Sequence, residues 1–424
     1  MRAVPSQTRA ASLFAVERVT GAPNVLAHLA RAHAAGAVVT PFQSEAWIAA
    51  LDADVAPALA ASTELLSVTD PATHEFLLAL PITVRRVGGL RVAEIADLGA
   101  SDYQAPVIGP AAASIAFDAP ARAALLAALG RALADVDMLR FEKMPREIVG
   151  RANPLAMLAG ARPSRFSANR LTVETTVEAF IAARGKKYRK EAERCFRRIA
   201  EEGEVRFARA ETAAEIEAAY AQLEAWQHAR HAEAGHVYAL ARPELSRFYR
   251  RLALAGMQDS ATLVSPSPLG GAGRGEGACT STPVARRFAS IFTLGVGGRP
   301  VAILYGVENA GTFTLLRIAD AGEDWKHVSP GRLVVIETMR HMVGRGIRVF
   351  DMGIGDYPFK RWIGCTAHPL VDLDVALRWR AWPRVAAAGL KRRLRENERV
   401  RALVARLRSV RPPSAVTAPV ETDA

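Results

Sequence analysis

The stretch from Trp325 to Gly364 constrains the fold more than any other part of this chain. It opens on the turn Ser329-Pro330-Gly331, continues with apolar residues at helical spacing, and passes two glycines before the apolar run 347–352. A serine suits the N-cap position and a proline the first position of a helix, whereas glycines often end one. A short apolar run is typical of a buried strand. The stretch therefore predicts a turn, a helix and a buried strand in direct succession.

The start of that helix is a candidate anion site. Free N–H groups and a partial positive charge face outward at a helix N-terminus, which suits a phosphate. We expect the backbone N–H groups of Gly331, Arg332 and Leu333 to bind it, with the Arg332 side chain adding charge. The following strand and loop supply further polar residues: Asp351, Asp356, Tyr357 and Lys360. Taken alone, the turn also fits an ordinary helix start, and Lys360 also fits a surface lysine.

Composition and charge limit the class of protein. The 424 residues suffice for about two or three domains, and with half of them hydrophobic and 23% charged the chain should be mostly globular. The net charge of +12 favours anionic partners, although frequent use of arginine accounts for about half of it. We therefore expect no tight nucleic-acid binding, while the phosphates of a tRNA or of a nucleotide carrier stay open as partners.

Cysteines and histidines predict neither disulfides nor a metal site. The chain has three widely separated cysteines: Cys195, Cys279 and Cys365. Three histidines cluster at 228–236, but no carboxylate or cysteine stands at ligand spacing. The N-terminus lacks the apolar core of a signal peptide, and no uncharged apolar stretch approaches the ~20 residues that span a bilayer. We expect a cytoplasmic protein, with membrane association only through its C-terminal part.

The first half of the chain alternates turns with apolar runs. Ser44 is a predicted N-cap, and Trp47, Ile48 and Leu51 follow as the buried face of a helix. The other predicted elements are strands at 12–19, 64–69, 75–87, 90–98 and 137–143 and a helix at 119–134. Asp102 and Tyr103 follow the predicted strand 90–98. They fit either a turn with a packed aromatic ring or one wall of an acceptor site.

The second half begins after a stretch rich in proline, serine and arginine, 160–169, which predicts a linker. The predicted elements are helices at 186–201, 216–231 and 243–255 and strands at 171–175, 288–294, 299–308, 312–319 and 368–377. Gly, Ser and Pro at 265–283 predict a flexible insertion. Residues 382–410 predict a basic amphipathic helix, and 411–424 a disordered tail. We expect that helix to dock on the protein body, with a partner or an anionic membrane as alternatives.

The predicted helix at 186–201 carries a basic ridge. Its members recur every three or four residues: Lys187, Lys190, Arg194 and Arg197. The opposite face is less polar: Tyr188, Ala192, Cys195 and Ile199. Such a ridge is either a solvated face or a rail for the phosphates of a carrier nucleotide, a tRNA or an anionic acceptor. Glutamates on the same helix weaken the positive electrostatic potential of the ridge.

The SPGRL turn and helix, followed by FDMGIGDYPFKRW, resemble the C-terminal half of the CelD-type acetyltransferases. Those are GNAT-fold proteins related to the Fem-type peptidoglycan aminoacyl transferases. The matching positions run in order: Ser329, Pro330, Gly331, Leu333, Phe350, Asp351, Gly353, Gly355, Asp356, Phe359, Lys360 and Trp362. The segments PFQSEAW and DYQAP resemble the N-terminal half of the same proteins. Within residues 226–231 Arg230 matches the family pattern, whereas the tryptophan does not.

This resemblance implies an α/β (α+β) fold of two tandem GNAT-like domains, with mixed, mostly antiparallel sheets flanked by helices. Residues 1–160 would be a degenerate unit that shapes the substrate cleft, and residues 170–380 the acyltransferase unit. The co-substrate would be acetyl-CoA or another acyl-CoA, held by the Ser329 turn and by a strand, Phe350 to Gly353, that parts from its neighbour. The acceptor would be an amine on a small molecule or on an envelope glycan or lipid precursor in polysaccharide biosynthesis.

The resemblance also implies roles for single residues. Lys360 would lie near the reacting carbonyl, where the matching Phe-Lys pair of Fem-type transferases places its lysine. Asp356, Asp351 or a water molecule would accept the amine proton. The acceptor would contact four residues: Asp102, Tyr103, Arg230 and Tyr357. Two other functions stay open, a Fem-type transferase that uses aminoacyl-tRNA and a non-catalytic scaffold of an exopolysaccharide system.

Overall fold

The computed structural model of the protein describes residues 13–235, 238–256, 287–355 and 357–396. The predicted insertion at 265–283, the predicted tail at 411–424 and the general-base candidate Asp356 lie outside the described residues. The same holds for the predicted basic helix beyond residue 396. In the described part of the chain, no helix is long and apolar enough to cross a membrane.

The first half of the chain forms helices and strands that largely follow the predicted order. They are β1 (Ala15–Thr20), α1 (Ala22–Ala34), α2 (Glu45–Asp54), β2 (Ser62–Thr69), β3 (Phe76–Val87), β4 (Leu90–Ile95), β5 (Val107–Ile108), α3 (Ala119–Ala132), β6 (Met138–Met144), β7 (Glu147–Ile148) and β8 (Arg151–Ala152). Helix α1 was not predicted. Ser44 caps α2 as predicted, because its side chain accepts the Trp47 N–H at 3.3 Å.

The second half follows with a longer series. It contains β9 (Arg162–Thr172), α4 (Val177–Ala183), α5 (Lys186–Glu201), β10 (Val205–Arg209), α6 (Ala213–Glu233), α7 (Pro243–Ala255), β11 (Ala289–Val296), β12 (Arg299–Asn309), β13 (Thr312–Asp320), α8 (Pro330–Gly344), β14 (Val349–Ile354), α9 (Pro358–Ile363), β15 (Thr366–Ala376) and α10 (Trp382–Glu396). Helices α5 and α7 have the predicted bounds. The apolar face predicted for α5 is buried, from Tyr188 to Ile199.

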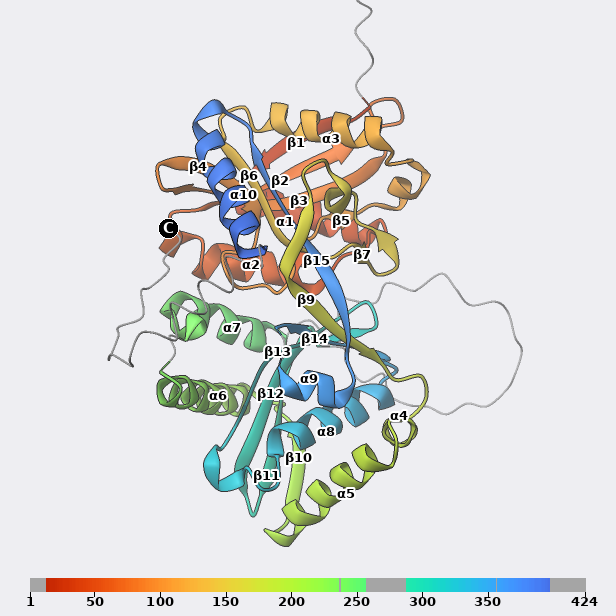
Figure 1. The fold of residues 1–424 in the computed structure, drawn as a ribbon, viewed down its shortest axis with the longest axis vertical. Helices are drawn as coiled ribbons and strands as arrows, with labels where there is room; N and C mark the ends of the chain where they lie inside the picture. Colours follow the sequence, from red (N-terminus) through yellow and green to blue (C-terminus); the bar gives the residue numbers. More distant parts are fainter. Residues whose placement is uncertain (1–12, 236–237, 257–286, 356, 397–424) are drawn as a thin grey trace, which may run out of the picture.

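In the described part of the chain, one mixed, mostly antiparallel sheet of 13 strands runs through both halves and is flanked by helices, which confirms the predicted fold class. Its order is β1-β2-β3-β4-β6-β15-β9-β14-β13-β12-β11-β10, with β5 beside β3. Among the described strands, only β4 with β6 and β13 with β14 pair in parallel. The strands β9 and β15 cross from one half to the other (Figure 1).

The prediction of a linker at 160–169 was wrong, because most of these residues belong to β9. This strand lies between β14 and β15, so its backbone has hydrogen-bonding partners on both sides. Pairing on both edges overrides the weak strand propensity of proline, serine and arginine. The strand β15 also pairs with β6, from Val371 opposite Met144 to Ala376 opposite Met138. The last strand of the second half thereby extends the sheet of the first.

A shared hydrophobic core also joins the halves. Trp47 of α2 lies edge-on to Phe248 of α7, with ring centroids 4.9 Å apart. Tyr249 of α7 donates its hydroxyl to the Ala100 carbonyl at 2.5 Å, and the Tyr305 hydroxyl of β12 donates to the Tyr249 carbonyl at 3.0 Å. Because this contact is apolar and continuous with the sheet, we expect the halves to move as one body.

Candidate active site

Strands β13 and β14 part in the middle of the sheet. They pair at only three positions, from Thr312 opposite Val349 to Thr314 opposite Asp351. Beyond that point residues 315–320 of β13 and Met352 and Ile354 of β14 line a pocket of about 490 Å³. The predicted separation of these strands is therefore present. Phe350 itself packs in the core against Phe313, with the ring centroids 6.4 Å apart, and its side chain does not line the pocket.

The start of α8 forms one end of this pocket. Ser329 occupies the N-cap position in a left-handed conformation (φ 53°, ψ 57°), and its side chain makes no capping hydrogen bond. Its carbonyl accepts the Arg332 N–H at 3.0 Å and the Leu333 N–H at 3.4 Å. Of the three N–H groups predicted to bind an anion, only that of Gly331 has no partner among the described residues. The predicted anion site thus keeps one of its three predicted N–H donors. The Leu333 side chain lies in the core.

A carboxylate also lies beside this turn. A Cβ added to Gly331 would meet Asp320 Oδ2 at 3.1 Å, so little room separates the turn from that negative charge. Two cationic side chains, Lys326 and Arg332, line the same end of the pocket. The electrostatic balance at the turn is therefore mixed and not purely cationic.

Glu191 of α5 ties the turn to α9. Its Oε1 lies 2.5 Å from Arg332 Nη1, and its Oε2 accepts the Trp362 indole N–H at 3.1 Å. The Arg332 guanidinium stacks on the Trp362 ring, 4.5 Å from its centroid. Burial raises the pKa of Glu191, but the hydrogen bonds from Trp362 and Arg332 outweigh it and hold the pKa below its ordinary value. The Arg332 charge is thus paired and does not stand free for a phosphate.

Replacing Glu191 with alanine is expected to lower the free energy of unfolding by about 1–2 kcal/mol, because two charge-assisted contacts are lost. The measurement is urea unfolding followed by circular dichroism. Glu193→Ala on the same helix serves as the control, since Glu193 forms only an exposed pair with Arg189 and should cost less than about 0.5 kcal/mol. Equal losses in the two variants would show that Glu191 does not join the turn to α9.

Asp351 is held at the end of the paired region of β14. Its Oδ1 accepts the Tyr103 hydroxyl at 2.6 Å and the Gly353 N–H at 2.8 Å, and its Oδ2 accepts Arg170 Nε at 2.7 Å. The residue is 2% exposed. A carboxylate with these partners is suited to fixing the strand and its neighbours. Tyr103 is likewise buried and does not line the pocket. Of the two alternatives for Tyr103, a packed aromatic ring and a wall of the acceptor site, the structure shows the packed ring.

Asp102, next to Tyr103, does line the pocket. Its Oδ2 accepts the Ile354 N–H at 3.3 Å. Burial raises the pKa of Asp102 to about 6, and the neighbouring Asp351 adds to the rise, whereas Lys143 and Lys360 oppose it. A carboxyl group with this pKa is mostly ionised at neutral pH yet basic enough to take a proton, which is the property of a general base.

Gly353 makes room for that carboxylate. A Cβ at this position would lie 2.1 Å from Asp102 Oδ2, and the backbone φ is +71°. Gly353→Ala is therefore expected to lower the free energy of unfolding by about 2–4 kcal/mol, from overpacking and left-handed strain together. Gly346→Ala is the matched control, because Gly346 has φ +86° but open space around it and should cost about 1 kcal/mol. Thermal and urea unfolding of the two variants measure the difference. Similar losses would mean that contact with Asp102 does not matter.

Lys360 reaches the same peptide segment from α9. It is 3% exposed, and its Nζ donates to the Gly353 carbonyl at 3.1 Å and the Ile354 carbonyl at 2.6 Å. The ammonium also lies 5.2 Å from the centroid of the Tyr357 ring. Lys360 and Tyr357 both line the pocket. The interpretation of Lys360 as a surface lysine was therefore wrong, since the side chain is buried and points to the parted strands.

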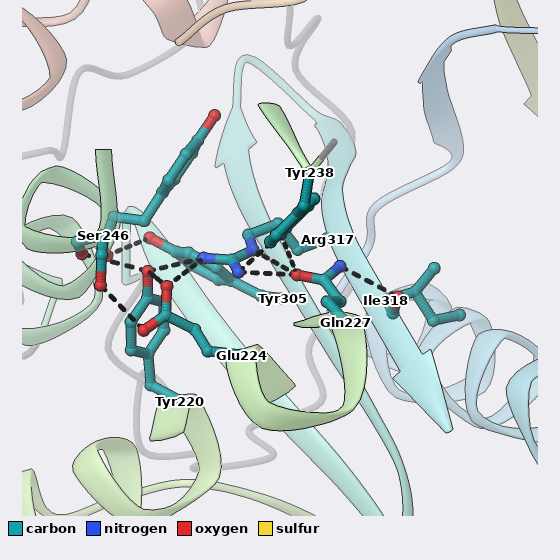
Figure 2. A network of polar contacts seen from close by, with 9 residues as sticks. Tyr220, Glu224, Gln227, Tyr238, Ser246, Tyr305, Arg317 and Ile318 are labelled. Carbon is teal, nitrogen blue, oxygen red and sulfur yellow. Dashed lines mark hydrogen bonds and ion pairs between the residues drawn. The ribbon is translucent and has the colours of Figure 1, made fainter. Parts of the chain in front are cut away.

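Helix α6 closes the other side of the pocket, where sequence reasoning had singled out only Arg230. Arg317 of β13 is 2% exposed, and its guanidinium donates to Tyr220 at 2.6 Å, to Gln227 at 2.6 Å and to Tyr238 at 2.8 Å (Figure 2). The only sequence signal for it was one charged residue in the apolar strand 313–319. Arg230, His231 and Arg317 line the pocket, and Arg317 is paired with Glu224 at 3.3 Å, so the guanidinium of Arg230 supplies positive charge to this wall. No group of three or more potential metal ligands occurs in the part of the chain that the structure describes.

Part of the sequence matches a known protein family, and the fold resembles solved structures. Residues 186–265 and 278–361 match the family model described as an acetyltransferase (GNAT) domain. No curated protein matches the sequence. The crystal structure of FemX has a TM-score of 0.53 and 10% identity, covering 85% of this chain and 98% of that chain.

Two further solved structures show weaker likeness. A tandem GNAT protein from the clavulanic acid biosynthesis pathway has a TM-score of 0.43 and 11% identity, covering 86% of this chain and 99% of that one. The C-terminal domain of a putative lysylphosphatidylglycerol synthetase from Agrobacterium fabrum has a TM-score of 0.46 and 10% identity, covering 84% and 92%. Residues 186–361 are thus similar to a GNAT-type acetyltransferase domain, and the fold of the chain is similar to that of FemX.

Proposed function

We propose that this protein transfers an acyl group from a thioester, acetyl-CoA or another acyl-CoA, to an amine. The observation that carries the proposal is the parting of β13 and β14, which opens one pocket between the start of α8 and the pair Asp102 and Lys360. Strand edges exposed in such a gap can hydrogen-bond an extended amide-bearing chain, as they would a peptide strand. The pantetheine arm of CoA is such a chain. The match to an acetyltransferase (GNAT) domain supports the same donor.

The donor would lie along this gap. Its diphosphate would bind near the Gly331 N–H and the ammonium of Lys326, at the end of the pocket formed by α8. Its thioester would lie at the opposite end, next to Lys360. A held donor and a nearby amine turn a bimolecular reaction into an effectively unimolecular one.

The reaction would then need a base and a stabilised oxyanion. Asp102 would take a proton from the acceptor ammonium, and the freed nitrogen lone pair would attack the thioester carbonyl carbon. The Lys360 ammonium would stabilise the negative charge on the carbonyl oxygen in the tetrahedral intermediate. The C–S bond then breaks, the nitrogen gives up its second proton and the thiolate is protonated. Asp351 would act as a positioning residue that fixes β14 through Tyr103 and Arg170.

A specific observation keeps an aminoacyl-tRNA donor as a second candidate. Two of the three N–H groups at the start of α8 are engaged, and the Asp320 carboxylate lies beside Gly331. The turn therefore offers fewer free N–H donors to a diphosphate than the SPGRL sequence predicted. An ester donor of the Fem type would need no diphosphate at this turn, and the net charge of +12 favours a polyanion.

The acceptor would be an amine carried by a small molecule or by an envelope glycan or lipid precursor, as the CelD-type resemblance implies. Arg230 of α6 lines the pocket. Its guanidinium supports an acceptor that carries an anionic group beside its amine. A place in polysaccharide biosynthesis is the part of this proposal that rests on the resemblance alone.

Equilibrium binding separates the two donors and tests the enzyme itself. We expect saturable binding of acetyl-CoA that changes little with salt, and weak binding of total tRNA that falls steeply as salt rises. Tight tRNA binding with none of acetyl-CoA would favour the Fem-type donor. If neither donor binds, the protein is not a transferase, and a scaffold role for the fold replaces the proposal.

A further inference from the structure

We propose that the start of α10 and the turn before it form a docking surface for an anionic lipid bilayer. The proposal concerns a part of the molecule outside the pocket and does not depend on the proposed function. Its first support is two exposed tryptophans. Trp379 is 79% exposed and Trp382 is 66% exposed, whereas no other tryptophan in the described part of the chain is exposed to this extent. An indole ring in water exposes a large apolar area, and tryptophan favours the interface between lipid and water.

The helix presents apolar residues on two sides. On its inner side Val385, together with Ala381 of the preceding turn, packs on the first half in a cluster with Val92 of β4 and Met138 of β6. The described part of the helix, Trp382–Glu396, therefore contacts the protein body, as expected. The outer side carries Trp382 and, eight residues later, Leu390, which is 60% exposed.

The exposed residues between them are apolar as well: Pro383, Ala386 and Ala387. A surface helix normally exposes polar residues and buries apolar ones. The outer face of α10 up to residue 390 reverses this rule, and α10 lies on the outside of the first half (Figure 1). A face of this kind needs a partner that accepts apolar side chains.

The charge of α10 and of the turn before it indicates which partner. Residues 378–396 contain seven arginines and lysines and one glutamate, a net charge of +6 against +12 for the whole chain. Arg378 and Arg380 flank Trp379, and all three are exposed. An apolar helix face with tryptophan and leucine, bordered by basic residues, is the composition of helices that lie in the plane of a membrane surface. The basic residues match the negative potential of anionic lipid headgroups.

An anionic bilayer accounts for both features together. A nucleic acid would account for the charge but not for the exposed indole rings and Leu390. An apolar patch on another protein would account for the rings but not for a segment, residues 378–396, that carries half of the net charge of the chain. We therefore assign this surface to anionic lipid.

Vesicle flotation of the full-length protein tests the assignment. We expect it to float with vesicles in which about a third of the lipid is phosphatidylglycerol, and to bind at least about tenfold more weakly to vesicles of phosphatidylcholine alone. Binding should fall when salt is raised. The double variant Trp379→Ala/Trp382→Ala should bind anionic vesicles about tenfold more weakly, and Arg380→Glu about fivefold more weakly.

Leu13→Ala is the matched control. Leu13 is 54% exposed but lies at the opposite end of the sequence, so the variant should float like the unchanged protein. Unchanged thermal unfolding of all variants shows that each retains its fold. Three results would overturn the proposal: no flotation, equal binding to both kinds of vesicle, or full binding by the tryptophan double variant. Binding of total tRNA that persists in that variant, without flotation, would reassign the surface to nucleic acid.

Discussion

Replacing Lys360 with methionine is expected to lower kcat by about 10²–10³-fold, the typical cost of losing one group that stabilises an oxyanion. Methionine fills a similar volume but has no charge and no donor. The Lys360 Nζ is well placed for the role, because it is buried at the point where β13 and β14 part and is held by two backbone carbonyls of the Gly353–Ile354 segment. Single-turnover and steady-state rates with a fixed acyl-CoA and amine measure the effect.

Lys326→Met is the comparison for this result. Lys326 lines the opposite end of the pocket, so its loss should raise the KM for the donor and leave kcat nearly unchanged. Removing Lys360 also takes one donor from each of two carbonyls, although the Gly353 carbonyl keeps the Asn169 amide at 3.0 Å, and this loss is expected to cost about 1–2 kcal/mol of stability. The thermal unfolding of the variant therefore has to be measured beside its activity. Full turnover by a folded Lys360→Met protein would remove this lysine from the mechanism.

Replacing Asp102 with asparagine is expected to lower kcat/KM by about 10²–10⁴-fold at pH 8, because the general base is lost. Asparagine can still accept the Ile354 N–H, so the β14 segment should stay in place. The pKa of Asp102 is raised to about 6, and only the ionised form can accept a proton. In the unchanged protein kcat/KM should therefore rise with pH through about 6, and this limb should vanish in the variant. Persistence of the limb would assign the base to another group.

Unfolding gives an independent readout of the same pKa. The pKa of Asp102 is about 6 in the folded protein against an ordinary 3.8, so the folded state binds more protons between these values. The contribution of this group to the free energy of unfolding should accordingly fall as pH rises through that window. Asp102→Asn removes that contribution, so the variant should gain stability relative to the unchanged protein above about pH 6. Asp320→Asn, at the other end of the pocket, should leave both pH dependences in place.

Local sequence signals were sufficient for most helices and strands. The capping serine before α2, the alternating basic and apolar faces of α5 and the SPG start of α8 are decided by neighbours within about one or two helical turns. Helix α1 escaped notice because Gly21 gives it no side-chain cap. The strand β9 was mistaken for a linker, because its residues are poor strand formers and its two partners lie far away in the sequence.

The candidate site was also predicted only in part from the sequence. The resemblance around Ser329 and Lys360 located both ends of the pocket, but it could not show what each side chain contacts. The partners of Asp351, for example, are Tyr103 and Arg170, which lie 248 and 181 residues away. Asp102 meets the Ile354 N–H across 252 residues. Its raised pKa comes mainly from burial, a property that no sequence spacing encodes.

The sequence by itself determined the turn, helix and strand from Ser329 to Ile354, because caps, helical periodicity and apolar runs act between near neighbours. Only the tertiary structure decided that Asp102 lines the pocket while Asp351 is fully hydrogen-bonded, and that the start of α8 keeps a single N–H without a partner among the described residues. These outcomes depend on which strands pair and how far they part. Hydrogen bonding and burial between distant segments set them, and both are fixed only when the whole sheet has formed.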